Sequence, residues 1–256
     1  TVTTLYNAHG DATQVTDAVG LVTTMAYDNL DRLTQVNNPG GLIDYYTYDV
    51  LGQRLTHYNN LLGSTNKETT DFDVQGRITS QRAFGGDVTG TSYVWSSTLA
   101  TTGLGTFGGW TETITYANSK TVINKNDLFN RAVQHTDMGG FVTASTYDAG
   151  GRLVATATGT TGNTSGMAYV YYNTGQLKQS TLSYVTQTYY WDGTTIQFGT
   201  ETNAVTATYT YDKMGNRLSE VGTTTINGGA ATTWKNQSAT YDALGRMKTW
   251  AEAGTT

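Results

Sequence analysis

Short runs of alternating apolar and polar residues recur along the chain, and each run ends in an aromatic residue. The clearest runs are residues 21–27, 42–48, 141–147 and 205–211, which we predict to be β-strands. In a strand, successive side chains point to opposite faces, and here both faces mix apolar with polar residues. A compact sandwich needs one decidedly hydrophobic face. The pattern therefore predicts a single-layer sheet that is partly wetted on both sides.

One motif closes these runs: Tyr-Asp, two variable residues, Gly-Arg, and then an aliphatic residue. Copies begin at Tyr27, Tyr48, Phe72, Tyr147, Tyr211 and Tyr241, and a degenerate copy begins at Asn126. A step of 21 residues separates Tyr6, Tyr27 and Tyr48. A fixed period of this length indicates a repeat architecture. We predict one array over residues 1–256, with irregular insertions near 84–118, 158–167 and 221–235.

Each period holds two turns of similar chemistry, one inside the motif and one about ten residues before it. Asp or Asn in the first position and Gly in the fourth are typical of a type I turn that closes a hairpin. Where the motif glycine is missing, the replacements are Asp31 and Asn130, residue types that tolerate positive φ. We therefore interpret Asp28 and its counterparts as turn formers. The alternative, a calcium loop, lacks its spaced acidic pattern.

Composition agrees with strands and turns. The chain has 18 Tyr, 30 Gly, abundant Thr and a single proline, Pro39, and no segment shows helical spacing of apolar residues. The net charge of −5 gives no electrostatic footprint for nucleic acid or an anionic membrane. Cysteine is absent, which excludes disulfides and thiolate metal sites. No apolar stretch is long enough for a membrane span, so we expect no membrane insertion.

The residues that carry most enzyme chemistry are scattered. The three histidines, His9, His57 and His135, lie far apart in sequence. The motif arginines recur at one place in the repeat, and we expect them to bridge adjacent hairpins through carboxylates or turn carbonyls; they are Arg32, Arg54, Arg77, Arg152, Arg217 and Arg246. We predict a chain that is not an enzyme, with no catalytic, cofactor-binding or metal-binding residues and no cofactor. The tryptophans are expected to plug the curved sheet, with a sugar-stacking platform as the alternative; they are Trp95, Trp110, Trp191, Trp234 and Trp250.

These repeated motifs strongly resemble the YD-repeat, or Rhs-repeat, family, named for its Tyr-Asp pair. The resemblance covers essentially the whole chain through both half-motifs. It implies antiparallel β-hairpins that form a curved or spiralling single-layer sheet, a partial β-shell. In bacterial members such shells enclose a C-terminal toxin domain, and animal teneurins use a similar shell for adhesion. Bacterial shells of this family usually carry an aspartyl self-cleavage segment with an Asp-Pro pair, whereas Asn38 precedes the single proline, Pro39, here. We expect this chain to be an excerpt of a longer protein.

The resemblance and the lack of an active-site pattern predict a structural segment of a secreted or cell-surface bacterial shell. Its partners would be the remainder of the parent shell, or other copies joined through exposed strand edges, and an enclosed C-terminal domain. Two alternatives remain open at this point. One is an extracellular adhesion or carbohydrate-binding module that contacts a glycan, and the other is a subunit that assembles into tubes or filaments.

Overall fold

The computed structural model describes residues 1–102, 105–160 and 163–253. These residues form twenty β-strands and no helix, and the strands belong to one hydrogen-bonded sheet. Accordingly, the described part of the chain contains no helix capable of crossing a membrane. The prediction of an all-β chain of successive antiparallel hairpins is confirmed.

The chain divides into two compact units, and the first comprises Thr1–Tyr93 and Glu112–Val122. Its hairpins are short, and each strand pairs antiparallel with the next along the chain. The strands that lie wholly within it are β1 (Thr3–Tyr6), β2 (Ala12–Thr16), β3 (Val22–Tyr27), β4 (Leu33–Asn37), β5 (Ile43–Tyr48), β6 (Arg54–Asn59), β7 (Glu68–Phe72) and β8 (Ile78–Arg82). Strands β9 (Val88–Thr102), β10 (Gly105–Thr115) and β11 (Thr121–Asp127) contribute residues to both units.

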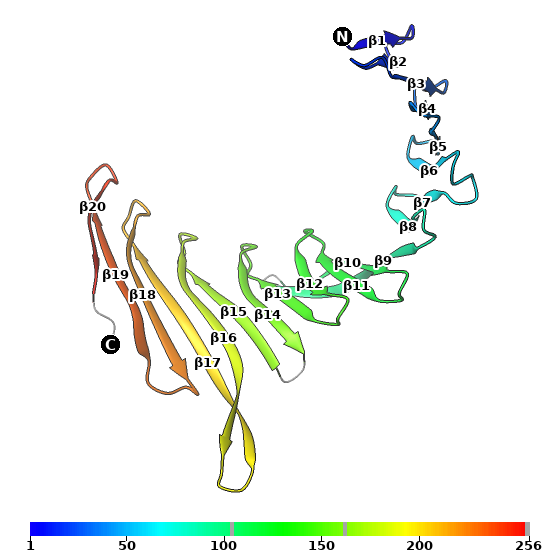
Figure 1. Ribbon diagram of the computed structural model, residues 1–256. Helices are drawn as coiled ribbons and strands as arrows, with labels where there is room; N and C mark the ends of the chain where they lie inside the picture. The colour runs from blue at the N-terminus through cyan, green and yellow to red at the C-terminus, as the bar shows by residue number, and fades with distance from the viewer. Residues whose placement is uncertain (103–104, 161–162, 254–256) are drawn as a thin grey trace. The chain divides into compact units, whose positions relative to one another are not determined.

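The second unit comprises Val94–Thr111 and the chain from Ile123 onward. Its strands again pair antiparallel in chain order. They are β12 (Ala132–Thr136), β13 (Val142–Tyr147), β14 (Leu153–Thr160), β15 (Asn163–Tyr171), β16 (Leu177–Trp191), β17 (Ile196–Tyr211), β18 (Arg217–Ile226), β19 (Thr232–Tyr241) and β20 (Met247–Glu252). These hairpins lie side by side, and the β16–β17 hairpin extends beyond its neighbours (Figure 1).

The turns have the predicted geometry. In the β3–β4 turn, the Asp31 amide donates to the Asp28 carbonyl and the Asp28 amide donates to the Arg32 carbonyl. This is a type I turn followed by a residue in the left-handed region, which produces a bulge beside Tyr27. Asp31, Asn130 and Gly151 occupy this position in three of the turns, with φ values of +58°, +60° and +79°, respectively. The expectation that Asp31 and Asn130 replace glycine at positive φ is confirmed.

The sheet has almost no hydrophobic core. Among the residues whose side chains are described, Ala100 is the one buried apolar residue. The buried polar residues are Asp127, Asn203 and Glu220, which are 2%, 6% and 8% exposed. The prediction of a sheet wetted on both faces is confirmed. Contacts between neighbouring strands must therefore supply most of the stability.

The three segments expected to be irregular are mostly regular strand. Segment 84–118 contains all of β9 and β10, segment 158–167 lies within β14 and β15, and segment 221–235 contains the β18–β19 connection. Residues 103–104 and 161–162 lie outside the described residues. The 21-residue period is interrupted because these hairpins are longer than the others. Their strands contain many Thr residues, which suit a half-solvated strand.

The tryptophans do not plug the sheet as a group, because all five are exposed large side chains. Trp95 lies over Gly108 and Trp234 lies over Gly222, where an added Cβ would meet each indole ring at 2.5 Å. Trp191 and Trp250 are 65% and 55% exposed, so the expectation is wrong for these two. Neither has a hydrophobic interior to enter, since the sheet is a single layer.

Candidate functional site

The motif aspartate organises its own turn and then binds the motif arginine. In the copy that begins at Tyr27, Asp28 Oδ1 accepts hydrogen bonds from the amides of Leu30 and Arg32 at 2.9 and 3.0 Å. Its Oδ2 accepts the Arg32 Nε at 2.8 Å and forms an ion pair with Nη2 at 2.7 Å. The Arg32 side chain holds the pKa of Asp28 below its usual value. One carboxylate therefore fixes both the turn and the direction of the guanidinium.

The same arginine then reaches the next hairpin. Arg32 Nη1 donates to the Asp49 carbonyl at 2.6 Å, and its guanidinium lies over the Tyr48 ring, 5.0 Å from the centroid. Tyr48 Oη donates back to the Leu33 carbonyl at 2.7 Å. We call this set of Asp, Arg and next-hairpin Tyr a hairpin clamp. The expectation that motif arginines bridge adjacent hairpins through turn carbonyls is confirmed here.

The clamp recurs along the sheet. Arg152 binds Asp148 through Nε at 2.7 Å, donates to the Tyr172 carbonyl at 3.3 Å and lies over the Tyr171 ring at 4.8 Å. Tyr171 Oη in turn donates to the Leu153 carbonyl at 2.8 Å. The motif thus joins neighbouring hairpins with polar and cation–π contacts, which do not need a hydrophobic layer.

The most buried clamp belongs to the degenerate motif copy at Asn126. The Asp127 side chain is fully buried, accepts the amides of Phe129 and Arg131, and pairs with the Arg131 guanidinium. That guanidinium lies between the Phe129 and Tyr147 rings, 5.0 and 4.6 Å from their centroids. Burial alone would raise the pKa of Asp127, but the hydrogen bonds from Arg131 outweigh it and lower the pKa. Sequence reasoning passed over this pair because Asn126 replaces the motif Tyr, although Arg131 keeps the four-residue spacing from Asp127.

Two motif arginines occupy a different place from the one predicted. In the copies at Tyr48 and Tyr211 an extra residue precedes the arginine, so Gln53 and Asn216 take the clamp position. Gln53 Nε2 still reaches the next turn, at the Gly76 carbonyl, 3.1 Å away. One residue of offset turns a strand side chain to the opposite face. Accordingly, Arg54 lies over the Tyr46 ring, within its own hairpin. The expectation that all motif arginines share one position is wrong for Arg54 and Arg217.

His57 forms a separate polar cluster in the first unit. Its Nε2 lies 2.9 Å from Asp44 Oδ1, and its Nδ1 lies 2.9 Å from Glu68 Oε2. The imidazole stacks on Tyr46 and meets Phe84 edge-on. The two carboxylates bind opposite nitrogens, so the three groups do not converge on one point. The cluster joins β6 to β7, whose backbone register consists of two residue pairs.

The other two histidines lie on the surface. His9, Asp11 and Asp31 bring one nitrogen and two oxygens within 4.8 Å of one another, a set that could hold a metal ion. His9 Nδ1 already binds Asp31 at 2.7 Å with both side chains exposed, and Asp11 accepts from Asn7. His135 is exposed in β12 and contacts Asn124 at 2.7 Å.

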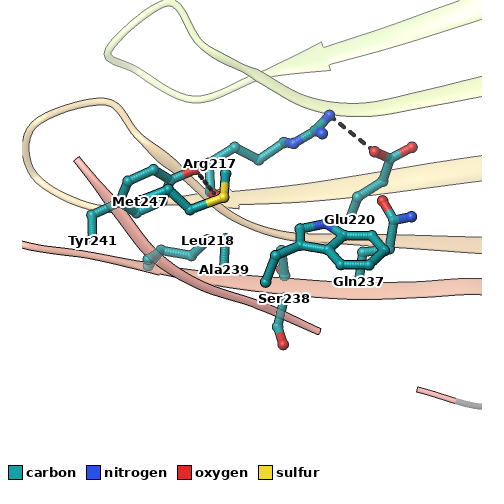
Figure 2. Close-up of a pocket in the computed structure, with 10 residues that line it drawn as sticks. Arg217, Leu218, Glu220, Gln237, Ser238, Ala239, Tyr241 and Met247 are labelled. Atoms are coloured by element: carbon teal, nitrogen blue, oxygen red, sulfur yellow. Dashed lines mark hydrogen bonds and ion pairs between the residues drawn. The ribbon is translucent and has the colours of Figure 1, made fainter. Parts of the chain in front are cut away.

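A small pocket lies between β18, β19 and β20 (Figure 2). Its volume is about 100 Å³, below the ~300–1,000 Å³ of ordinary ligand sites. Its buried carboxylate, Glu220, is bound by Arg217 at 2.9 Å and by Lys235 at 2.7 Å. Tyr241 Oη donates to the Arg217 carbonyl across the same pocket. The polar groups therefore satisfy one another, which is typical of a structural network.

Comparison with known proteins bears on the motif itself. The RHS repeat family model matches residues 6–43, which span the hairpins from the end of β1 to the start of β5. This segment is an RHS repeat. The resemblance to the YD-repeat, or Rhs-repeat, family is thereby confirmed for these residues. The clamp of Asp28, Arg32 and Tyr48 begins within the RHS repeat segment and ends in the hairpin that follows it. No curated protein matches the chain.

Several solved structures are similar to the chain at low identity. A crystal structure of TcdB2–TccC3 with Cdc42 aligns with 14% identity and a TM-score of 0.44, over 96% of this chain and 14% of that chain. The Photorhabdus luminescens Tc holotoxin pore aligns with 12% identity and a TM-score of 0.32, over 96% of this chain and 18% of that chain. The chain thus spans less than a fifth of the length of these proteins. At these scores the similarity does not define a shared function.

Proposed function

We propose that the chain is a non-catalytic structural segment of a larger secreted or cell-surface RHS-repeat shell, in which it encloses or presents another domain. The observation that carries this proposal is the hairpin clamp, which uses the motif residues for contacts between neighbouring hairpins. An Arg held by its own Asp, and stacked on the next Tyr, is engaged in the wall and is not presented to a substrate. We also propose that residues 1–256 belong to one repeat array.

The wet faces of the sheet support the same proposal. Along strands such as β17, exposed and half-buried side chains alternate and mix polar with apolar residues, and such a wet inner face would suit an enclosed, loosely folded chain. Exposed strand edges would pair with the remainder of the parent shell or with another copy. The enclosed domain would lie outside residues 1–256, and its chemistry is not specified by this chain.

The test begins with the parent gene on both sides of this segment. A long repeat array followed by a variable C-terminal domain is expected. Limited proteolysis of that full-length protein should then leave the C-terminal domain protected. Arg131→Ala combined with Arg152→Ala should expose it to protease, while the matched control Arg54→Ala, outside the clamp, should not. A parent protein with no domain beyond the repeats, or one cleaved equally in all variants, would overturn the proposal.

One observation favours carbohydrate binding as a second candidate function. The Trp95 and Trp110 rings lie edge-to-face with centroids 5.3 Å apart, and the side chains are 49% and 42% exposed. Adjacent exposed indoles are the arrangement that stacking on sugar rings requires. A glycan array of the chain tests this candidate, with Trp110→Ala as the variant and Trp250→Ala as a distant control. Binding lost in the first variant alone would support it, and an array without signal would refute it.

A further inference from the structure

The end of the β16–β17 hairpin is a two-stranded ribbon without neighbouring strands. Pairing of β15 with β16 stops at Gly166 and Ser183, and pairing of β17 with β18 stops at Asn203 and Ile226. Residues 184–201 therefore pair only across the hairpin, and this part extends past the adjacent strands (Figure 1). We call residues 184–201 the tip ribbon. An isolated two-stranded ribbon is marginally stable in water, so a second layer would stabilise it.

The tip ribbon has one strongly apolar face. Tyr189 is paired with Phe198 and Trp191 with Ile196, and directly opposed residues point to the same face of a sheet. These four side chains are 76%, 78%, 65% and 59% exposed, respectively. They form a contiguous patch at the end of the hairpin, which we call the aromatic face. Tyr190, opposite Gln197, lies on the other face.

The aromatic face carries no charge. The next pair on it towards the body of the sheet is Gln187 and Thr200. Glu201, one residue further along β17, points to the opposite face. Asp192 lies in the turn, where its carboxylate accepts the amides of two turn residues and the side chain of Gln197. A second copy of the chain can thus approach this face without like-charge repulsion, although each copy has a net charge of −5.

We infer that the aromatic face is a self-association surface, which docks against the same face of a second copy. Large apolar side chains on both strands make the patch suitable for a two-fold interface in which identical surfaces meet. Two ribbons packed face to face at about 10 Å would make a small two-layer sandwich. Because the ribbon extends past its neighbours, the second copy reaches it without contact from β15 or β18.

The size of the patch predicts a weak dimer. Large aromatic side chains bury about 150–250 Å² each. Four partly exposed apolar side chains therefore offer on the order of 500 Å² per copy, or about 1,000 Å² in total, the lower limit of specific interfaces. We expect a reversible dimer in the micromolar to millimolar range.

Two other occupants fit less well. A bilayer would surround the unpaired backbone groups at both edges of the ribbon, which is costly in hydrocarbon, whereas a face-to-face dimer leaves those edges in water. A sugar site needs polar groups that converge on the ligand, and the polar pair on this face, Gln187 and Thr200, lies at one end of the patch.

Sedimentation velocity of the 256-residue chain over a range of concentrations tests the inference. Phe198→Thr and Trp191→Thr, which keep strand propensity, should each raise the dimer Kd at least tenfold. The matched control Tyr190→Thr, on the opposite face, should change the Kd less than twofold. Far-UV circular dichroism and unchanged thermal unfolding would show that each variant folds.

Tryptophan emission provides a second readout. The contribution of Trp191 should move the emission maximum to shorter wavelength as wild-type protein is concentrated. The emission maximum of Phe198→Thr should not move. A strictly monomeric wild-type chain would overturn the inference. So would association that survives both face variants, since it would then use strand edges. Binding to zwitterionic vesicles or to glycans that Phe198→Thr abolishes, in a chain that does not self-associate, would assign the face to that ligand instead.

Discussion

The buried clamp allows a direct test of how much the motif carboxylate contributes. Asp127→Asn keeps an oxygen for the turn amides of Phe129 and Arg131 but replaces the oxygen that pairs with the guanidinium by an NH₂ donor. Arg131, with 17% of its side chain exposed, then remains unpaired between two aromatic rings. Breaking a buried ion pair by removing one partner costs about 3–5 kcal/mol. We expect the β11–β12 hairpin to lose stability on that scale.

A matched control exists in the same motif at the other extreme of exposure. Asp242 accepts hydrogen bonds from the Arg246 amide at 2.9 Å and from Arg246 Nε at 2.7 Å, as Asp127 does from Arg131. However, 75% of the Arg246 side chain is exposed. Water replaces the lost partner there, so Asp242→Asn should have a much smaller effect.

Native-state hydrogen exchange is the suitable assay, because it reports the free energy of opening hairpin by hairpin without requiring the whole array to unfold in two states. The amides of Arg131 and Arg246 are the reporters. Equal losses at the two sites, or no change at Arg131, would refute the claim that burial makes the clamp strong.

Three further outcomes follow from the turns and clamps. Gly151→Val should destabilise the chain by about 1–3 kcal/mol in thermal unfolding, because Gly151 has a φ of +79°. Asp31→Gly should be neutral or stabilising, because glycine accepts the φ of +58° there. If Asp31→Gly destabilised the chain more than Gly151→Val, the assigned turn register would be wrong. Tyr48→Phe should cost about 0.5–1.5 kcal/mol in urea unfolding through loss of the bond to the Leu33 carbonyl, and an unchanged midpoint would refute that bond. Hydrogen bonds from arginine side chains and turn amides lower the pKa of the motif aspartates. The ionised aspartates therefore stabilise the folded chain above the usual Asp pKa near 4, and this stabilisation is lost as the pH falls through the lowered pKa values. A thermal unfolding midpoint that is unchanged between pH 6 and about pH 2 would contradict this.

Local turn chemistry was the part of the fold that the sequence predicted best. The Asp-x-x-Gly spacing defines the hairpin ends because few residues adopt positive φ, and Asp31 and Asn130 followed the same rule as glycine. The long strands β16 and β17 were not predicted at their full length. Between the tip ribbon and the body of the sheet, their Thr, Ala and Val residues place polar and apolar side chains on both faces, so no continuous hydrophobic stripe runs along either strand.

The clamp could be predicted only in part. The recurrence of Arg suggested a bridge between hairpins, but a one-residue insertion moved Arg54 and Arg217 off the clamp position. The most buried clamp was missed because its motif begins with Asn126 instead of Tyr. In both cases the spacing of four residues from Asp to Arg was the better signal, since it sets the reach of the guanidinium to its own carboxylate.

The clamp also has a consequence for how such a chain can change length during evolution. A unit that carries the clamp supplies an Arg and a carbonyl to the unit that follows and a Tyr to the unit that precedes, as Arg32, Leu33 and Tyr48 do. A duplicated 21-residue block therefore meets compatible partners at both of its borders, and a deleted block leaves compatible partners behind. Unequal recombination between copies can thus lengthen or shorten the wall by whole hairpins without compensating substitutions elsewhere.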